Sequence, residues 1–330
     1  MKTKRLIALV LAGLMIFSMP ACGKAKDLKD ALNSIKETTG AVAKNDKSDA
    51  ADTDGADNAD NADNADNADQ GGEDNSDAQS GVIDLGGQTV IDNEWATVTV
   101  NSLQLEDEYG DMVMKITIEN KSDTNFTLSL YTAAINGLEI NPYESADVAA
   151  GKKANVAIEW YSSDLEGLNR EDFSDFELNF GAYDEAYDDI FKDEVVHVYP
   201  YGEDKAAVYE RPAGETDEVI VDTDDVKIIC TGIFNDDYYG EYVEYYITNK
   251  TDKAIYVTAN SVSVNGIMME PYWGCEVGGN HSAYSQMTWS KEDFEENSVE
   301  GIEELEMTVS VKDSDTYDEI YSETMTLKIQ

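Results

Sequence analysis

An internal duplication constrains the fold of this chain more than any other feature of its sequence. Residues 116–143 and 245–272 align without a gap at an offset of 129, and eight of the 28 aligned positions are identical. The identities include an Asn-Lys pair and an Asn-Gly pair. Solenoid repeats are about 20–50 residues long, so a period of this size indicates a duplicated domain. The sequence therefore predicts two folded units of similar structure.

Apolar and polar residues alternate through both copies, as expected of strands with one buried face. The alternation includes Ile118 in the first copy and Ile247 at the matching position of the second. Each copy contains about seven such segments in some 110 residues, which is typical of a Greek-key sandwich. We therefore predict an all-β protein of two tandem β-sandwiches at residues 88–199 and 217–330, joined by a connector at residues 200–216.

The residues between the predicted strands have the chemistry of turns. Asn120 and Asn249 begin matching polar segments, and Asn side chains bond the local backbone in turns. Asn-Gly pairs at 136–137 and 265–266 lie between apolar flanks and predict hairpins, because both residue types accept a positive φ. After the second copy's Trp289, Ser290 and Asp293 have the spacing of a helix capping box.

The first 21 residues have the pattern of a secretory signal. Three basic residues precede an apolar run from Leu6 to Phe17, which is too short to span a membrane as a helix. The run leads to Ala21-Cys22-Gly23, which resembles the lipobox of bacterial lipoproteins. That resemblance implies cleavage before Cys22 and a diacylglycerol on its sulfur. We therefore expect a protein anchored by lipid to the extracellular face of the cell membrane. The alternative is a plain secreted protein with an incidental cysteine.

Two further segments separate the lipid anchor from the folded units. Residues 22–43 are expected to include a short amphipathic helix, because four apolar residues fall on one helical face. These residues are Leu28, Ala31, Leu32 and Ile35. Residues 44–87 are rich in Asp, Asn and Ala, and the stretch from Lys44 to Gly81 lacks any large apolar residue. We predict a disordered, acidic linker there, because such a segment has no core to offset its ordering entropy.

The charge balance excludes one class of partner. The chain has 69 acidic residues against 23 basic ones, whereas nucleic-acid-binding proteins need a basic surface. The two histidines, His197 and His281, occupy non-matching positions of the two copies, and the chain has no H-E-x-x-H or G-x-S-x-G motif. We therefore expect no nucleic acid as partner, and a protein that is not an enzyme.

Two cysteines lie in the second copy, where the first copy has Val100 and Ala146. These residues, Cys230 and Cys275, take matched apolar positions and would lie in one core. Two interpretations are open. They are two buried thiols, or they form a disulfide bond, which an exported protein can oxidise.

Acidic turns recur at matching places and are candidates for a weak calcium site, because Ca²⁺ takes six to eight oxygen ligands. The candidate ligands are Asp184, Asp188, Asp189, Asp313, Asp315 and Asp318. No EF-hand spacing accompanies them. The simpler interpretation is a set of solvated turns, with no cofactor bound.

Aromatic residues suggest a recognition surface in the second copy. Exposed rings supply rigid area for contact with a protein or a glycan. The candidates are Tyr242, Tyr246, Tyr272 and Trp273. The alternative is that these residues are present because aromatic side chains favour strands.

One family shows a similar pattern over most of residues 88–330. The chain resembles the immunoglobulin-like domains of Gram-positive surface lipoproteins, a family without an assigned function. The residues that carry the resemblance are Ile118, Asn120, Lys121, Ser122, Asp123, Asn136 and Gly137, with their counterparts in the second copy. The resemblance implies two immunoglobulin-like sandwiches and no catalytic residue.

The sequence as a whole favours a cell-surface lipoprotein that binds or displays through non-catalytic modules. Its partner would be an envelope protein or a glycan. A structural spacer or accessory subunit of an envelope complex is the first alternative. An enzyme with an unrecognised site is the second.

Overall fold

A computed structural model describes residues 81–236 and 240–328, and all of these residues belong to one compact unit. Nearly all of the regular structure consists of antiparallel strands, so the all-β prediction is confirmed. The predictions that fall on residues 1–80 lie outside the described residues. They are the signal peptide at 1–21, the lipidated Cys22, the helix within 22–43 and most of the linker at 44–87.

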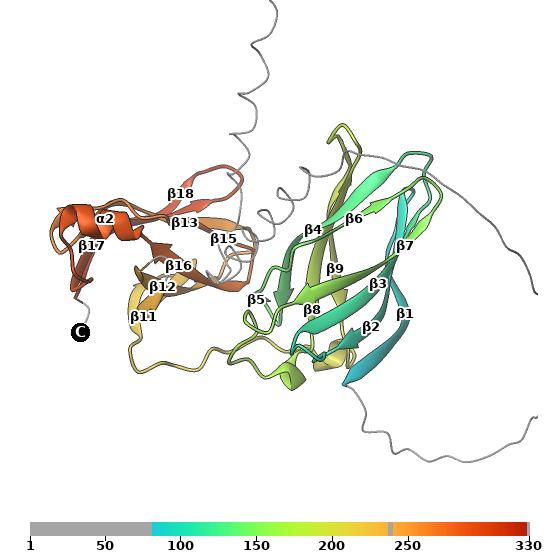
Figure 1. Ribbon diagram of the computed structural model, residues 1–330, viewed down its shortest axis with the longest axis horizontal. Helices are drawn as coiled ribbons and strands as arrows, with labels where there is room; N and C mark the ends of the chain where they lie inside the picture. The colour runs from blue at the N-terminus through green and yellow to red at the C-terminus, as the bar shows by residue number, and fades with distance from the viewer. Residues whose placement is uncertain (1–80, 237–239, 329–330) are drawn as a thin grey trace, which may run out of the picture. The chain divides into compact units, whose positions relative to one another are not determined.

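The first half contains nine strands in two layers (Figure 1). One layer has the order β1-β2-β3-β7, and the other has β4 paired with β5, β6 and β8, and β8 with β9. The strands are β1 (Val82–Asp92), β2 (Ala96–Gln104), β3 (Met112–Asn120), β4 (Phe126–Ile135), β5 (Leu138–Glu139), β6 (Glu144–Val148), β7 (Lys153–Trp160), β8 (Phe176–Tyr183) and β9 (Asp189–Val198).

The second half repeats this strand order. One layer is β10-β11-β12-β16, and the other has β13 paired with β14, β15 and β17, and β17 with β18. The strands are β10 (Glu218–Asp222), β11 (Val226–Asp236), β12 (Gly240–Asn249), β13 (Ile255–Val264), β14 (Ile267–Met268), β15 (Cys275–Val277), β16 (Ser282–Thr288), β17 (Glu304–Asp313) and β18 (Glu319–Lys328). The duplicated sequence therefore produces duplicated topology.

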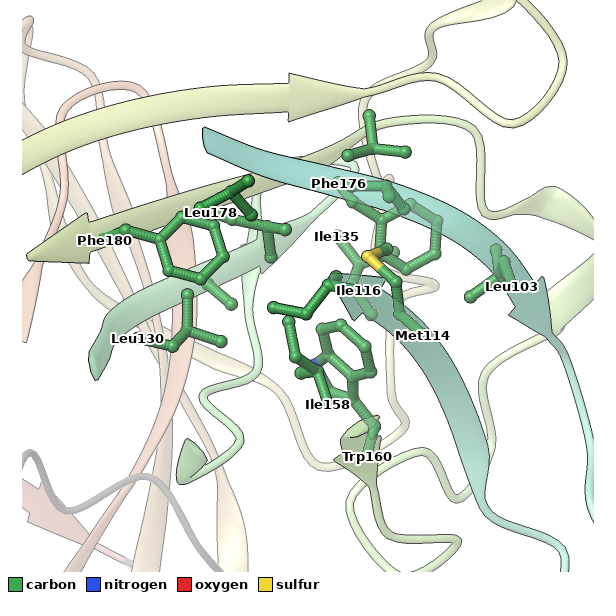
Figure 2. Packing of buried hydrophobic residues seen from close by; sticks show 14 of the residues in the cluster. Leu103, Met114, Ile116, Leu130, Ile135, Ile158, Trp160, Phe176, Leu178 and Phe180 are labelled. Atoms are coloured by element: carbon green, nitrogen blue, oxygen red, sulfur yellow. The ribbon is translucent and has the colours of Figure 1, made fainter. Parts of the chain in front are cut away.

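Each half closes its two layers over a core of its own. Figure 2 shows the core of the first half, in which Trp160 lies among aliphatic side chains. The ring of Phe176 packs edge to face against Trp160, with 5.7 Å between the two ring centroids. The Trp160 indole N–H donates to the carbonyl of Ile140 at 2.9 Å. Trp289 makes the matching bond to the carbonyl of Met269 at 3.0 Å. A buried indole N–H needs such a partner, so both halves fix the ring in the same way.

Each of two matching turns, after β3 and after β12, is organised by its own buried asparagine. Asn120 is 1% exposed; its amide donates to the carbonyls of residues 124 and 148, and its Oδ1 accepts from the Ser122 N–H. Asn249 repeats this arrangement with Thr251. The Asn-Gly turns are also confirmed, since Asn136 and Asn265 both have a positive φ. The turn chemistry expected from the sequence therefore sets the strand connections.

The folded region begins earlier than expected. Strand β1 starts at Val82, within the segment assigned to the linker that ends at residue 87. Ile83 and Leu85 pack against the first core. The pairing of β1 with β2 shifts in register between residues 84 and 88, where two glycines have a positive φ. Burial of these two apolar side chains offsets the entropy cost of ordering the polar residues beside them.

Helical structure in the described residues is short. Helix α2 (Lys291–Asn297) begins at the predicted capping box, in which the Ser290 hydroxyl accepts from the Asp293 N–H and the Asp293 carboxylate accepts from the Ser290 N–H. Two 3₁₀ turns, η1 (Arg170–Asp172) and η2 (Glu203–Lys205), complete the set. Within residues 81–236 and 240–328, no helix has the length and apolar character needed to cross a membrane.

The two halves share one sheet. Strand β16 lies parallel to β5 and pairs with it at Ser282 and Leu138, which joins the β10-β11-β12-β16 layer to the β5-β4-β8-β9 layer. The Ser282 N–H donates to the carbonyl of Gly137 at 2.8 Å. This contact, here called the junction, brings together side chains that lie more than 100 residues apart in the sequence.

Candidate functional site

The junction gathers both histidines of the chain around one carboxylate. His281 Nε2 lies 3.2 Å from Glu177 Oε2, and His197 Nε2 lies 3.6 Å from the same oxygen. His281 Nδ1 lies 3.2 Å from Glu139 Oε1. His197 Nδ1 lies 2.8 Å from Asp175 Oδ1. The result is a cluster of three carboxylates and two imidazoles, built from β5, β8 and the residue before it, β9 and the loop before β16.

Local backbone geometry explains how His281 reaches this cluster. The loop from Gly278 to His281 crosses over the hairpin of the first half, and the Gly278 N–H donates to Glu139 Oε1 at 2.6 Å. Gly279 lies against the backbone of Asp252, where an added Cβ would approach within 2.5 Å. A larger residue at position 279 would displace the loop, so the glycine allows the close approach.

The two carboxylates control the charge of His281. Burial alone would lower the pKa of the imidazole, but hydrogen bonds to Glu139 and Glu177 outweigh burial and raise the pKa to about 9. The hydrogen bond with His281 is also the main cause of a lowered pKa at Glu177. At neutral pH both ring nitrogens of His281 therefore carry protons and donate to carboxylates. The cluster can hold the two halves together through charge-assisted hydrogen bonds.

The connector adds an apolar and cationic contact beside the junction. Arg211 makes a bidentate ion pair with Asp217, with both N–O distances at 2.7 Å. Its guanidinium also lies over the ring of Tyr246, 5.5 Å from the centroid. The ring of Tyr284 packs on the Tyr246 ring, with 5.0 Å between the two centroids. The Tyr209 N–H donates to the carbonyl of Asn136 in the first half, so the connector binds both halves.

These contacts overturn part of the recognition surface expected from the sequence. Tyr246 is only 6% exposed, because Arg211 and Tyr284 cover it. Trp273 is half-buried on the second core, and its indole N–H donates to Ser285. Tyr242 is also half-buried and stacks on Phe234. Of the four predicted aromatics, only Tyr272 has a largely exposed ring.

The structure adds three exposed tyrosines to Tyr272, and the four form two pairs at matching positions of the repeat. Tyr143 and Tyr272 are both exposed beside the hairpins of their halves. Tyr187 and Tyr317 lie at the tips of the β8–β9 and β17–β18 hairpins, 79% and 68% exposed. Both tip tyrosines have a positive φ, of 64° and 61°. The offset of 130 between them was available in the sequence, but their exposure and backbone conformation were not.

The two cysteines both line the second core. Cys230 lies on β11 and Cys275 on β15, each buried among apolar side chains. No disulfide bond joins them in the described structure. Burial raises the pKa of the Cys230 thiol to about 11. This placement fits the interpretation of two buried thiols.

The acidic turns use their carboxylates to hold the backbone. Asp184 Oδ1 accepts from the N–H groups of Ala186 and Asp188, and Asp313 Oδ1 accepts from those of Asp315 and Thr316. Of the other predicted calcium ligands, Asp318 lies in the same turn as Asp313, and Asp189 is the first residue of β9, directly after the Asp184 turn. In the part of the chain that the structure describes, no group of three or more His, Cys, Asp or Glu side chains is placed to hold a metal ion.

The junction could not be found from the sequence. Glu139 and Glu177 are separated from His281 by 142 and 104 residues. The acidic composition makes single glutamates uninformative, and the two histidines occupy non-matching positions of the repeat. The only available signal was the presence of a histidine in the loop before a predicted strand.

Comparisons with known proteins give little more. No family model and no curated protein matches the chain. Among solved structures, a protein of unknown function from Porphyromonas gingivalis is 9% identical with a TM-score of 0.19, covering 67% of this chain and 91% of that one. Red sea bream transglutaminase is 9% identical with a TM-score of 0.20, covering 71% and 31%. The exo-chitosanase CsxA of Amycolatopsis orientalis is 11% identical with a TM-score of 0.19, covering 69% and 26%. The chain thus spans about a third or less of these two enzymes, and similarities this low carry no argument.

Proposed function

We propose that this chain is a non-catalytic binding or display protein of the cell surface. In this proposal a lipid on Cys22 holds the chain to the membrane, and the acidic segment that begins at residue 44 and ends before strand β1 carries two immunoglobulin-like modules away from the lipid surface. The partner is an envelope protein or a glycan. The anchor rests on the lipobox-like Ala21-Cys22-Gly23, and the binding role rests on the exposed tyrosines.

The observation that carries the binding role is the matched pair Tyr187 and Tyr317. A bulky residue with φ in the left-handed region costs on the order of 1–3 kcal/mol. These two residues are also largely exposed, although the Tyr187 ring stacks on Tyr183 with 5.5 Å between the ring centroids. The same unfavourable arrangement occurs at the tip of the last hairpin in both halves. Aromatic rings offer rigid contact area and often dominate binding energy at interfaces. A contact with a partner at both tips would offset the cost.

The test introduces a photo-crosslinking phenylalanine analogue at position 187, or at position 317, of the full chain displayed on cells. After irradiation, the adducts are identified by mass spectrometry. We expect both positions to give adducts with the same partner, because the two tips present the same side chain in the same backbone conformation. The control position is Tyr201, which is also exposed but lies in the connector.

A second pair of variants separates binding from stability. Tyr187→Gly and Tyr317→Gly each remove a ring and also relieve the positive φ, so the fold should be unchanged or slightly more stable. Capture of the cross-linked partner should nevertheless decrease. Adducts that are equally frequent at position 201, or glycine variants that retain full capture, would refute the binding role.

A structural spacer is the second candidate, and the junction favours it. The bonds of His281 and Ser282 to the first half, together with the Arg211–Asp217 pair in the connector, restrict relative motion of the two halves. Two modules held in a fixed arrangement suit a protein that sets a distance. If this candidate is correct, the tip positions give no adduct beyond the control.

The anchor has its own test. Labelled fatty acid should be incorporated into the wild-type chain and not into Cys22→Ser, and that variant should appear in the culture medium. Equal labelling of both chains would refute lipidation at Cys22 without bearing on the tyrosine tips.

A further inference from the structure

The junction consists of a donor edge and an acceptor hairpin. The donor is the start of β16, where Ser282 donates its N–H to Gly137 and His281 reaches Glu177. The acceptor is the Asn-Gly hairpin with strand β5, whose Leu138 is only 3% exposed. Both parts lie within the duplicated region, so each has a counterpart in the other half.

The counterpart of the donor is the start of β7. Lys152 and Lys153 stand where His281 and Ser282 stand in the second half. The backbone match is close, because the Asn120 N–H donates to the Lys152 carbonyl at 2.8 Å and the Asn249 N–H donates to the His281 carbonyl at 2.8 Å. In the described sheets β7 pairs only with β3, so its other edge is open.

The counterpart of the acceptor is strand β14, with Ile267 and Met268 in place of Leu138 and Glu139. Within the described residues β14 pairs only with β13. Met268 is 61% exposed, although its counterpart is covered by the junction. An open strand edge that carries exposed apolar side chains is a surface that another strand can cover.

Charge complementarity indicates which strand covers it. Glu306 occupies the position of Glu177. Glu177 pairs with Ala134 and Glu306 pairs with Ser263, and each of these partners lies two residues before the Asn-Gly turn of its half. Both Lys152 and Glu306 are exposed. A copy of the chain that docks its β7 edge on the β14 edge of another copy would therefore place Lys152 opposite Glu306. This pair would replace the His281–Glu177 pair of the junction.

We propose that copies of this chain associate head to tail, with the β7 edge of one copy docked on the β14 edge of the next. The contact repeats the junction between molecules, and a contact between two different surfaces generates an open chain of copies. It is weaker than the junction, because Thr117 and Asn155 occupy the positions of Tyr246 and Tyr284 on the outer face of the donor sheet. The association is therefore reversible and depends on concentration.

The net charge of the chain gives the test its discriminating power. At a formal net charge of −46, nonspecific repulsion opposes any self-association. Added salt should strengthen the association, because it screens this repulsion. Glu306→Lys lowers that repulsion and would promote a nonspecific association. In the specific contact the same substitution places Lys152 of one copy opposite a lysine at position 306 of the next, and it therefore weakens the association. The two explanations predict opposite results.

The experiment measures sedimentation of the purified chain over a range of concentrations. Wild type should form a series of oligomers. Lys152→Glu and Glu306→Lys should each weaken the association by about tenfold or more, because each juxtaposes like charges. The double variant, which restores opposite charges, should associate as wild type does. Met268→Lys should abolish the series, because it places a second cation near Lys152, at the position where Glu139 faces His281 in the junction.

Two controls and two outcomes complete the design. Lys205→Glu and Val208→Asp change exposed connector residues outside both edges, and each should sediment as wild type. Circular dichroism of every variant checks that the fold is intact. A wild type that stays monomeric at every concentration and salt level overturns the proposal. So does a double variant that associates no better than the single ones.

Discussion

Loss of the proton on His281 should weaken the junction, and the substitution that isolates this effect is His281→Gln. Glutamine can still donate to one carboxylate, but it does not titrate. His281 Nδ1 faces Glu139 on β5, and Nε2 faces Glu177 on β8, which also contacts His197 on β9. The pKa of His281 is raised to about 9 in the folded chain. The protonated form therefore favours folding.

The magnitude follows from the change in pKa. A rise from the ordinary value of 6.5 to about 9 corresponds to about 3 kcal/mol, at about 1.4 kcal/mol for each pKa unit. Because the folded-state pKa is the higher one, this contribution is complete below pH 6.5. It decreases as the pH rises and is lost above pH 9.

Urea denaturation of wild type and His281→Gln measures the effect. The difference in unfolding free energy between the two chains should decrease by about 3 kcal/mol between about pH 6 and about pH 10. Subtraction of the variant removes the contributions of other titrating groups. NMR of the imidazole protons gives the pKa directly, since the chain has only two histidines. His197→Gln identifies the second signal and is the matched control.

Two results would refute this reasoning. The first is a His281 signal that titrates near 6.5, which would mean that the carboxylates do not hold the proton. The second is a pair of stability curves that stay parallel from acid to alkaline pH. Either result would show that the cluster does not couple protonation to the contact between the halves.

Three further outcomes test the fold itself. Asn120→Ala should lower the unfolding free energy by ~3 kcal/mol in urea denaturation, because the Val148 carbonyl loses its amide donor and the Ser122 N–H loses its acceptor; an unchanged midpoint would contradict this. Trp289→Phe should cost ~2–4 kcal/mol by thermal or urea denaturation, since the Met269 carbonyl loses its donor and a small cavity remains; a cost below ~1 kcal/mol would be inconsistent with that bond. Cys230 should react with iodoacetamide about 100-fold more slowly in the folded chain than in urea, because burial raises the thiol pKa from 9.0 to about 11; equal rates by mass spectrometry would show an accessible thiol.

Features that depend on neighbouring residues could be predicted from the sequence. The Asn-Gly turns, the buried Asn120 turn and the capping box at Ser290 all depend on side chains within a few residues of the backbone that they bond. The alternation along β12 is also correct, because Val243 and Ile247 lie in the core. Short-range chemistry and strand periodicity are both encoded locally.

Features that depend on distant contacts could not be predicted. The burial of Tyr246 requires Arg211 of the connector, which was expected to be only a link between modules. The early start of β1 requires packing of Ile83 and Leu85 on a core whose strands come later in the chain. The junction requires Glu139 and His281 to meet across 142 residues. None of these pairs has a local sequence signature.

The cover over Tyr246 determines where this protein can be divided. A recombinant fragment that starts at residue 217 would lose Arg211 and Tyr209, and it would expose the rings of Tyr246 and Tyr284 to water. Such a fragment should aggregate at the concentrations used for crystallisation, because it exposes an apolar patch. A fragment of the first half would in turn need residues up to Tyr209, whose backbone closes the Asn136 turn. The connector is thus a shared part of both modules, and neither can be excised cleanly from the other.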